Sequence, residues 1–189
     1  MTPMLGIMAS QISGHLVTGA FDSIATVAVG VGGSSTITFS SIPSTYTHLQ
    51  IRGIVRDNRA VSTDQDMKMT FNSDTAANYS SHALYGSGAS AASSSEVSSN
   101  YALIGSSIGD SALASTFGVV VCDILDYTNT NKYKTTRSLS GFDLNGAGYV
   151  YLNSGNWRNT AAITQIDVTP YSATAFKQYS HFALYGIKG

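Results

Sequence analysis

Apolar and polar residues alternate along most of this chain, and the alternating segments return about every 10 to 15 residues with turn-forming residues between them. Successive side chains of a β-strand point to opposite faces, so a period of two predicts strands that bury one face. Segments 48–56 and 66–71 show the pattern most clearly. The residues expected to point into a core are Leu49, Ile51, Val55, Met67, Met69 and Phe71. No segment shows a convincing helical period over more than about two turns, so the chain is expected to be all-β.

Other segments extend this pattern. Segments 23–29 and 35–39 predict a hairpin turned by Gly30-Val-Gly-Gly33. Residues 86–116, rich in Gly, Ser and Ala, predict a long loop that could hold a short strand near 101–104. The near-continuous apolar run 117–126 predicts a strand covered on both faces. Further strands are expected within 134–140, 148–152, 163–169 and 182–185.

One strand-like sequence occurs twice. The segment Tyr79-Ser-Ser-His-Ala-Leu-Tyr-Gly86 returns one hundred positions later as Tyr179-Ser-His-Phe-Ala-Leu-Tyr-Gly186. The shared Ala-Leu-Tyr-Gly ending predicts two similar strands in which Leu84 and Leu184 point inward. The histidine in each copy is expected to form hydrogen bonds at a sheet corner rather than to bind a metal.

The expected count of eight to ten strands favours a two-sheet antiparallel sandwich of the jelly-roll kind over a seven-stranded immunoglobulin-like sandwich. A length of 189 residues fits one domain with a sizeable core. We therefore expect a single β-sandwich domain over residues 21–189, preceded by a short flexible N-terminal arm over residues 1–20.

Composition argues against several classes of protein. Charged residues make up only 11 %, and the net charge is −1, so a basic surface for nucleic acid is not expected. The hydrophobic content of 43 % is too high for a disordered chain. No apolar run reaches the roughly 18 residues of a membrane span, and no Lys or Arg precedes Arg52 as in a secretory signal. The single Cys122 allows no intrachain disulfide, which fits folding in a reducing cytoplasm.

Polar residues suggest no catalytic, cofactor or metal site. The four histidines lack any metal-ligand spacing. Asp64 and Asp66 are expected in a solvated turn rather than in a calcium site, because nothing nearby completes an oxygen cage. Asp123 and Asp126 have no evident partner base for acid–base chemistry. The protein is therefore not expected to be an enzyme.

Two groups of apolar and aromatic residues are candidates for contact with partners. The N-terminal arm packs either on its own domain or on a neighbouring subunit, and its candidate contact residues are Met4, Leu5, Ile7, Met8 and Ile12. A second candidate surface is formed by Tyr101, Tyr149, Tyr151 and Trp157. Such aromatics can stack on sugar rings, but a place in the core or in a subunit interface is favoured.

Four segments resemble virion proteins of tailed bacteriophages, and they occur in the order that the resemblance expects over most of residues 20–189. They are Phe39-Ser-Ser-Ile-Pro-Ser-Thr-Tyr-Thr-His-Leu-Gln-Ile-Arg52, Asn72-Ser-Asp-Thr-Ala-Ala-Asn-Tyr-Ser80, Trp157-Arg-Asn-Thr-Ala-Ala-Ile-Thr164 and Ala183-Leu-Tyr-Gly-Ile187. The resemblance implies a trimeric β-sandwich of the virion, assembled in the cytoplasm of the bacterial host.

The resemblance further implies a head decoration (cement) protein that binds the major capsid protein or other virion proteins as a homotrimer and stabilises the shell. The alternative is a tail or fibre component that binds host surface polysaccharide, with the four aromatic residues named above as the glycan contact. Neither role requires nucleic acid, a membrane or a cofactor.

Overall fold

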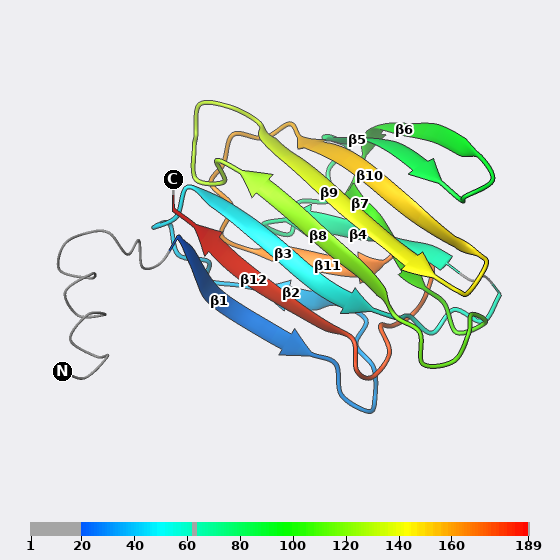
Figure 1. Ribbon diagram of the computed structural model, residues 1–189. Helices are drawn as coiled ribbons and strands as arrows, with labels where there is room; N and C mark the ends of the chain where they lie inside the picture. Colours follow the sequence, from blue (N-terminus) through cyan, green and yellow to red (C-terminus); the bar gives the residue numbers. More distant parts are fainter. Residues whose placement is uncertain (1–19, 62–63, 189) are drawn as a thin grey trace, which may run out of the picture.

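The computed structural model describes residues 20–61 and 64–188, which form twelve β-strands and no helix (Figure 1). All pairings between these strands are antiparallel. In chain order the strands are β1 (Phe21–Ala28), β2 (Ile37–Phe39), β3 (His48–Val55), β4 (Asp64–Phe71), β5 (Tyr79–Gly86), β6 (Ala91–Ser99), β7 (Ala102–Ile108), β8 (Gly118–Leu125), β9 (Lys134–Asp143), β10 (Gly148–Trp157), β11 (Ile166–Pro170) and β12 (His181–Ile187).

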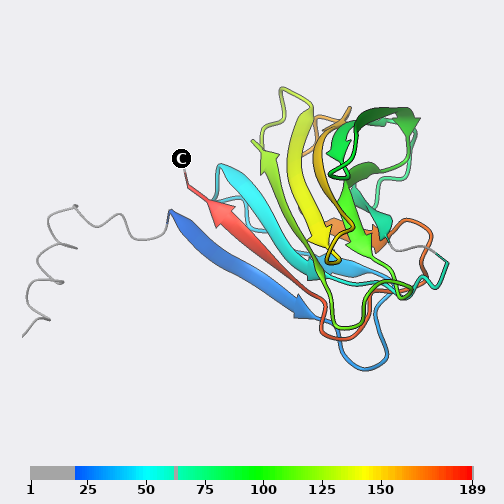
Figure 2. The same ribbon diagram turned by 45° about the vertical axis from the view of Figure 1, so that its right-hand side comes forward.

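The strands form two sheets of unequal size. The larger has the order β1-β12-β3-β8-β9-β10-β5-β6, and the smaller has the order β2-β11-β4-β7. The larger sheet curves around the smaller one, and its outer face is turned toward the reader in Figure 1 (Figures 1 and 2). The predicted two-sheet antiparallel sandwich is therefore confirmed.

The topology is that of a jelly roll. Eight strands (β1, β2, β3, β4, β7, β8, β11 and β12) divide into two four-stranded arrays, β1-β12-β3-β8 and β2-β11-β4-β7. This is the strand order of two interlocked Greek keys. Two hairpins are inserted into that plan: β5–β6 between β4 and β7, and β9–β10 between β8 and β11. Both join the same edge of the larger sheet, which consequently extends beyond the smaller sheet.

The core lies between the sheets, and its members are those that the alternation predicts. Leu49, Ile51, Val55, Met67, Met69 and Phe71 are all fully buried. At one end of the core, the ring of Trp157 lies 5.4 Å from that of Phe71 and stacks on Tyr79 at 6.2 Å. Burial of large apolar side chains from both sheets is the main force that holds the layers together.

Three predicted elements differ from the structure. The segments expected to form a hairpin, β1 and β2, lie in different sheets and pair with β12 and β11. The predicted loop over 86–116 contains the Ser-rich strand β6, which pairs with β5, while the short strand expected near 101–104 is present as the longer, fully buried β7. The run at 117–126 is covered on one face only: in β8 buried and exposed residues alternate.

The repeated sequence forms two strands of the larger sheet, but their side chains face opposite ways. Leu184 in β12 points inward and is fully buried, as predicted. The prediction is wrong for Leu84 in β5, which points outward and is 55 % exposed. Identical Ala-Leu-Tyr-Gly segments can do this because the pairing register, not the local sequence, decides which face of a strand is buried.

Candidate interaction surface

Apolar side chains gather on the outer face of the larger sheet, where no other part of the described chain covers them. Seven of them, contributed by β3, β5, β8, β9 and β10, have exposed fractions between 38 % and 60 %. This set, called the apolar patch below, consists of Ile54, Leu84, Val119, Val121, Leu139, Val150 and Leu152.

The strand register aligns most of the patch into one continuous row. Val121 in β8 pairs with Leu139 in β9, Leu139 pairs with Leu152 in β10, and Leu152 pairs with Leu84 in β5. Directly opposed residues on one sheet face are close enough to contact each other. The row therefore forms an apolar ridge across four neighbouring strands.

A second row lies beside this ridge and completes the patch. Ile54 pairs with Val119, and Val119 pairs with Gly141. Gly141 then pairs with Val150 in β10. Glycine presents no side chain at this position, so the row leaves a shallow gap between its two valines.

A polar row borders the other side of the ridge. The carboxylate of Asp123 accepts hydrogen bonds from Gln50 Nε2 at 2.7 Å and from an Arg137 guanidinium nitrogen at 3.0 Å. Asp123 therefore has its ion-pair partner, Arg137, within the same chain. The pair contributes little to stability at the surface, but it neutralises the charge of Asp123 beside the ridge.

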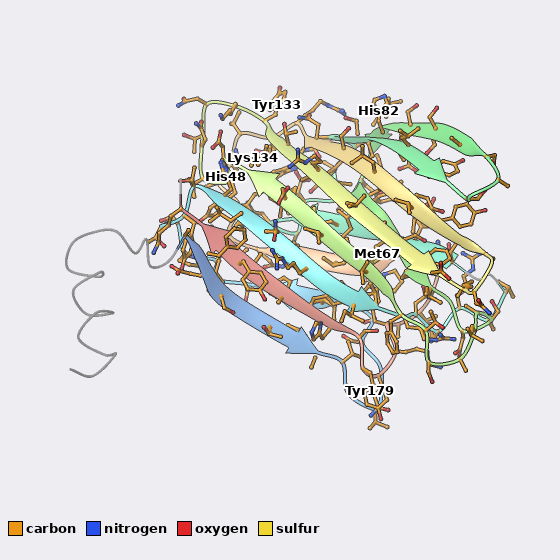
Figure 3. All side chains as sticks on the ribbon, viewed as in Figure 1. His48, Met67, His82, Tyr133, Lys134 and Tyr179 are labelled. Carbon is orange, nitrogen blue, oxygen red and sulfur yellow. The ribbon has the colours of Figure 1, made fainter. Side chains whose placement is uncertain are left out.

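The far end of the face is hollowed where the β5–β6 hairpin meets β10. This trough has a volume of about 510 Å³ and is lined by Leu84, Leu152, His82 and Arg137 together with serines of β6 and β10. His82 lies on this outer side of β5 (Figure 3). The trough thus combines the end of the apolar ridge with hydroxyl and imidazole groups.

The aromatic residues singled out from the sequence do not form one surface. Trp157 is 1 % exposed and belongs to the core, as the favoured interpretation had it, so its ring cannot meet a ligand. Tyr149 and Tyr151 are half-buried on the inner side of β10. Tyr101 lies apart from them, at 5.6 Å from the ring of Tyr171 and beneath the Lys68 ammonium group.

The other sequence candidates fall in three places. Asp64 and Asp66 lie in β4 rather than in a solvated turn, and both are partly buried. Asp126 accepts from Lys132, and its amide donates to His48 Nδ1 at 2.9 Å. The arm residues Met4, Leu5, Ile7, Met8 and Ile12 lie outside the described residues.

Within residues 20–61 and 64–188, no group of three or more His, Cys, Asp or Glu side chains is arranged to hold a metal ion. Nor does that part of the chain contain a helix long and apolar enough to cross a membrane.

No protein-family model matches this chain, and no curated protein matches it significantly. Sequence reasoning missed the apolar patch because Leu84 was assigned to the core and Leu139 stands alone among hydroxyl residues. The one signal present was the apolar run at 117–126, which has the composition of a strand covered on both faces.

Proposed function

We propose that this chain is a non-enzymatic structural protein of a tailed-bacteriophage virion that decorates the head as a homotrimer. Its copies contact one another through the apolar patch. The observation that carries the proposal is the continuous apolar ridge on a sheet face that the single chain leaves open.

The size and continuity of the patch support contact with another protein. Soluble monomers rarely expose a large contiguous apolar area, and larger patches mark interaction sites. Permanent subunit interfaces resemble a domain core cut in half, with few charges at their centre. The ridge has this character, since its members are Val and Leu and the neighbouring Asp123 is already neutralised within the chain.

The role in a virion is supported by the sequence resemblance together with the jelly-roll topology. A decoration protein acts mechanically: many identical contacts, repeated by the symmetry of the shell, add up to a large stabilising free energy. Such a protein needs a rigid fold and surfaces that bind neighbouring proteins.

The copy number in purified virions tests this role directly. Quantitative mass spectrometry should find hundreds of copies of the chain per particle. A few to a few dozen copies would overturn head decoration and favour the tail or fibre component that binds host polysaccharide.

Binding to empty heads gives an independent test. The wild-type protein should bind heads that lack it and should raise the temperature at which they rupture. Leu139→Asp should bind far more weakly, because a charge at the centre of the ridge breaks the contact between copies and leaves single copies with fewer contacts to the shell. Val31→Asp is the matched control, since Val31 is also exposed but lies in the turn between β1 and β2. Equal binding by both variants would contradict the proposed role of the patch.

A further inference from the structure

The overhang of the larger sheet creates a pocket on the inner side of the molecule. It has a volume of about 280 Å³ and is closed by β5, β6 and β10 on one side and by β4 and β7 on the other. Its wall combines three tyrosines with two carboxylates: Tyr85, Tyr149, Tyr151, Asp64 and Asp66. This inner pocket is separate from the apolar patch, which lies on the opposite face of the same sheet.

The tyrosine wall is a compact, ordered cluster. The rings of Tyr85 and Tyr151 stack with their centroids 5.3 Å apart, and Tyr149 lies 5.6 Å from Tyr151. The Tyr151 hydroxyl donates a hydrogen bond to Asp64 Oδ2 at 3.0 Å, which joins the aromatic wall to the acidic one. The pocket is therefore preformed rather than assembled from mobile side chains.

Two buried amide groups in the same wall have oxygens without a donor. Gln65 is 6 % exposed and Asn153 is 3 % exposed, and both line the pocket. Neither Gln65 Oε1 nor Asn153 Oδ1 accepts a hydrogen bond from any described residue. Buried polar atoms are normally paired, so these oxygens indicate that a donor from outside the chain completes the site.

The pocket is also electrically unbalanced. Two Asp side chains line it and no Lys, Arg or His does. Among the described residues, Asp66 has no ion pair within 4 Å. Burial, with smaller contributions from the carboxylates of Asp64 on the same strand and Glu96 on β6, raises the pKa of Asp66 to about 6. The other titratable side chains of the pocket are Tyr85 on β5 and Tyr149 and Tyr151 on β10, and none of them carries a positive charge.

We propose that this pocket binds the ammonium group of a small organic cation. An ammonium supplies the N–H donors that the oxygens lack and the positive charge that Asp66 lacks. A positive group on an organic ligand is also attracted by the faces of the tyrosine rings. A neutral sugar would supply donors but leave the charge of Asp66 uncompensated, and a bare metal ion would make no use of the aromatic wall.

The test is a titration of the purified full-length protein, followed by NMR chemical shifts of the pocket residues. Three probes separate the alternatives: glucosamine, tetramethylammonium and glucose. Glucosamine and glucose have nearly the same shape and differ by the charged amino group. Glucosamine should shift the pocket signals and bind at least tenfold more tightly than glucose, which lacks the charge. Tetramethylammonium, which has the charge but no N–H donor, should bind more weakly than glucosamine. Equal binding of the two sugars, or the absence of binding by both cations, would overturn the proposal.

Variants of the pocket provide the second half of the test. Asp66→Asn should weaken glucosamine binding at least tenfold, and it removes a buried charge, so loss of binding cannot be attributed to unfolding. Asp22→Asn is the matched control, since Asp22 lies on β1 at the opposite edge of the larger sheet. Binding should also weaken as the pH falls through about 6, because protonation neutralises Asp66. Unchanged affinity in Asp66→Asn would contradict the inference, whatever the outcome of the virion experiments.

Discussion

One buried cation, Lys134, is held by backbone carbonyls rather than by carboxylates. Lys134, at the start of β9 (Figure 3), is fully buried and its ammonium group donates to the carbonyl oxygens of Asn129, Lys132 and Thr160. Burial, with a smaller contribution from Lys132, lowers the pKa of Lys134. This side chain therefore ties the connection after β8 to the one after β10.

Replacing Lys134 should destabilise the protein far more than replacing its exposed neighbour. Lys134→Met keeps the apolar stem but leaves three carbonyl groups without their donor, so we expect a loss of about 2–3 kcal/mol in the free energy of unfolding. Lys132→Met is the control: it breaks only an exposed ion pair with Asp126 and should cost about 0–1 kcal/mol. Urea unfolding of both variants gives the comparison, and losses of equal size would refute this role for Lys134.

Asp66 should make the protein less stable as the pH rises. Its pKa is raised to about 6 in the folded protein from an ordinary value of 3.8, so the folded state holds the proton more tightly than the unfolded state. Stability is therefore highest below about pH 4 for this group and declines as the pH rises through about 6. We expect Asp66→Asn to raise the free energy of unfolding by about 1–2 kcal/mol at pH 7, with the gain vanishing at pH 4. A gain of the same size at both pH values would rule out titration of Asp66 as its cause.

At the scale of the elements, the contact between β7 and β9 requires a glycine. Gly105 has a φ of +121°, and a Cβ atom at this position would lie 2.2 Å from Ser140 Oγ. Beside it, the Ser106 amide donates to the same oxygen at 3.1 Å. The edge strand of the smaller sheet can therefore lie directly beneath β9.

Gly105→Ala should be strongly destabilising because it combines backbone strain with a steric clash. We expect a loss of about 2–5 kcal/mol, as the sum of the two effects. Gly88→Ala separates the backbone strain from the steric clash. Gly88 also has a positive φ, of +84°, but nothing lies within 4 Å of its added Cβ. Its cost should be limited to about 1–2 kcal/mol of backbone strain. Thermal unfolding measures both, and a milder effect at Gly105 than at Gly88 would contradict the packing argument.

The sequence predicted elements well where one face is buried against the other sheet. Met67, Met69 and Phe71 alternate with polar residues, so their inward direction could be read directly. Pairing between strands could not be read, because it depends on partners distant in the sequence: β1 pairs with β12 and not with the neighbouring β2. Ser-rich β6 has little strand propensity of its own and exists through its pairing with β5.

The candidate sites were harder to predict than the fold, because they too depend on pairing between strands that are distant in the sequence. Leu84 and Leu184 occupy the same position in a repeated sequence, yet one belongs to the exposed patch and the other to the core. The inner pocket brings together residues from five strands, and Asp64 and Asp66 acquire their surroundings only when β10 closes over them. Local sequence contains no information on such long-range neighbours.

At the scale of the whole molecule, the two inserted hairpins account for both candidate sites. They extend the larger sheet beyond the smaller one, which leaves the inner pocket beneath the overhang and enlarges the outer face that bears the apolar patch. A minimal eight-stranded jelly roll would have neither. We propose that other copies of the chain cover this enlarged face.

The mass of the purified protein in solution tests that claim most directly. Analytical ultracentrifugation should find a trimer for the wild type and for Val31→Asp. The double variant Leu139→Asp/Leu152→Asp should sediment as a folded monomer, because two carboxylates on the ridge would have to be desolvated in the interface. A monomeric wild-type protein, or a double variant that remains trimeric, would contradict the account.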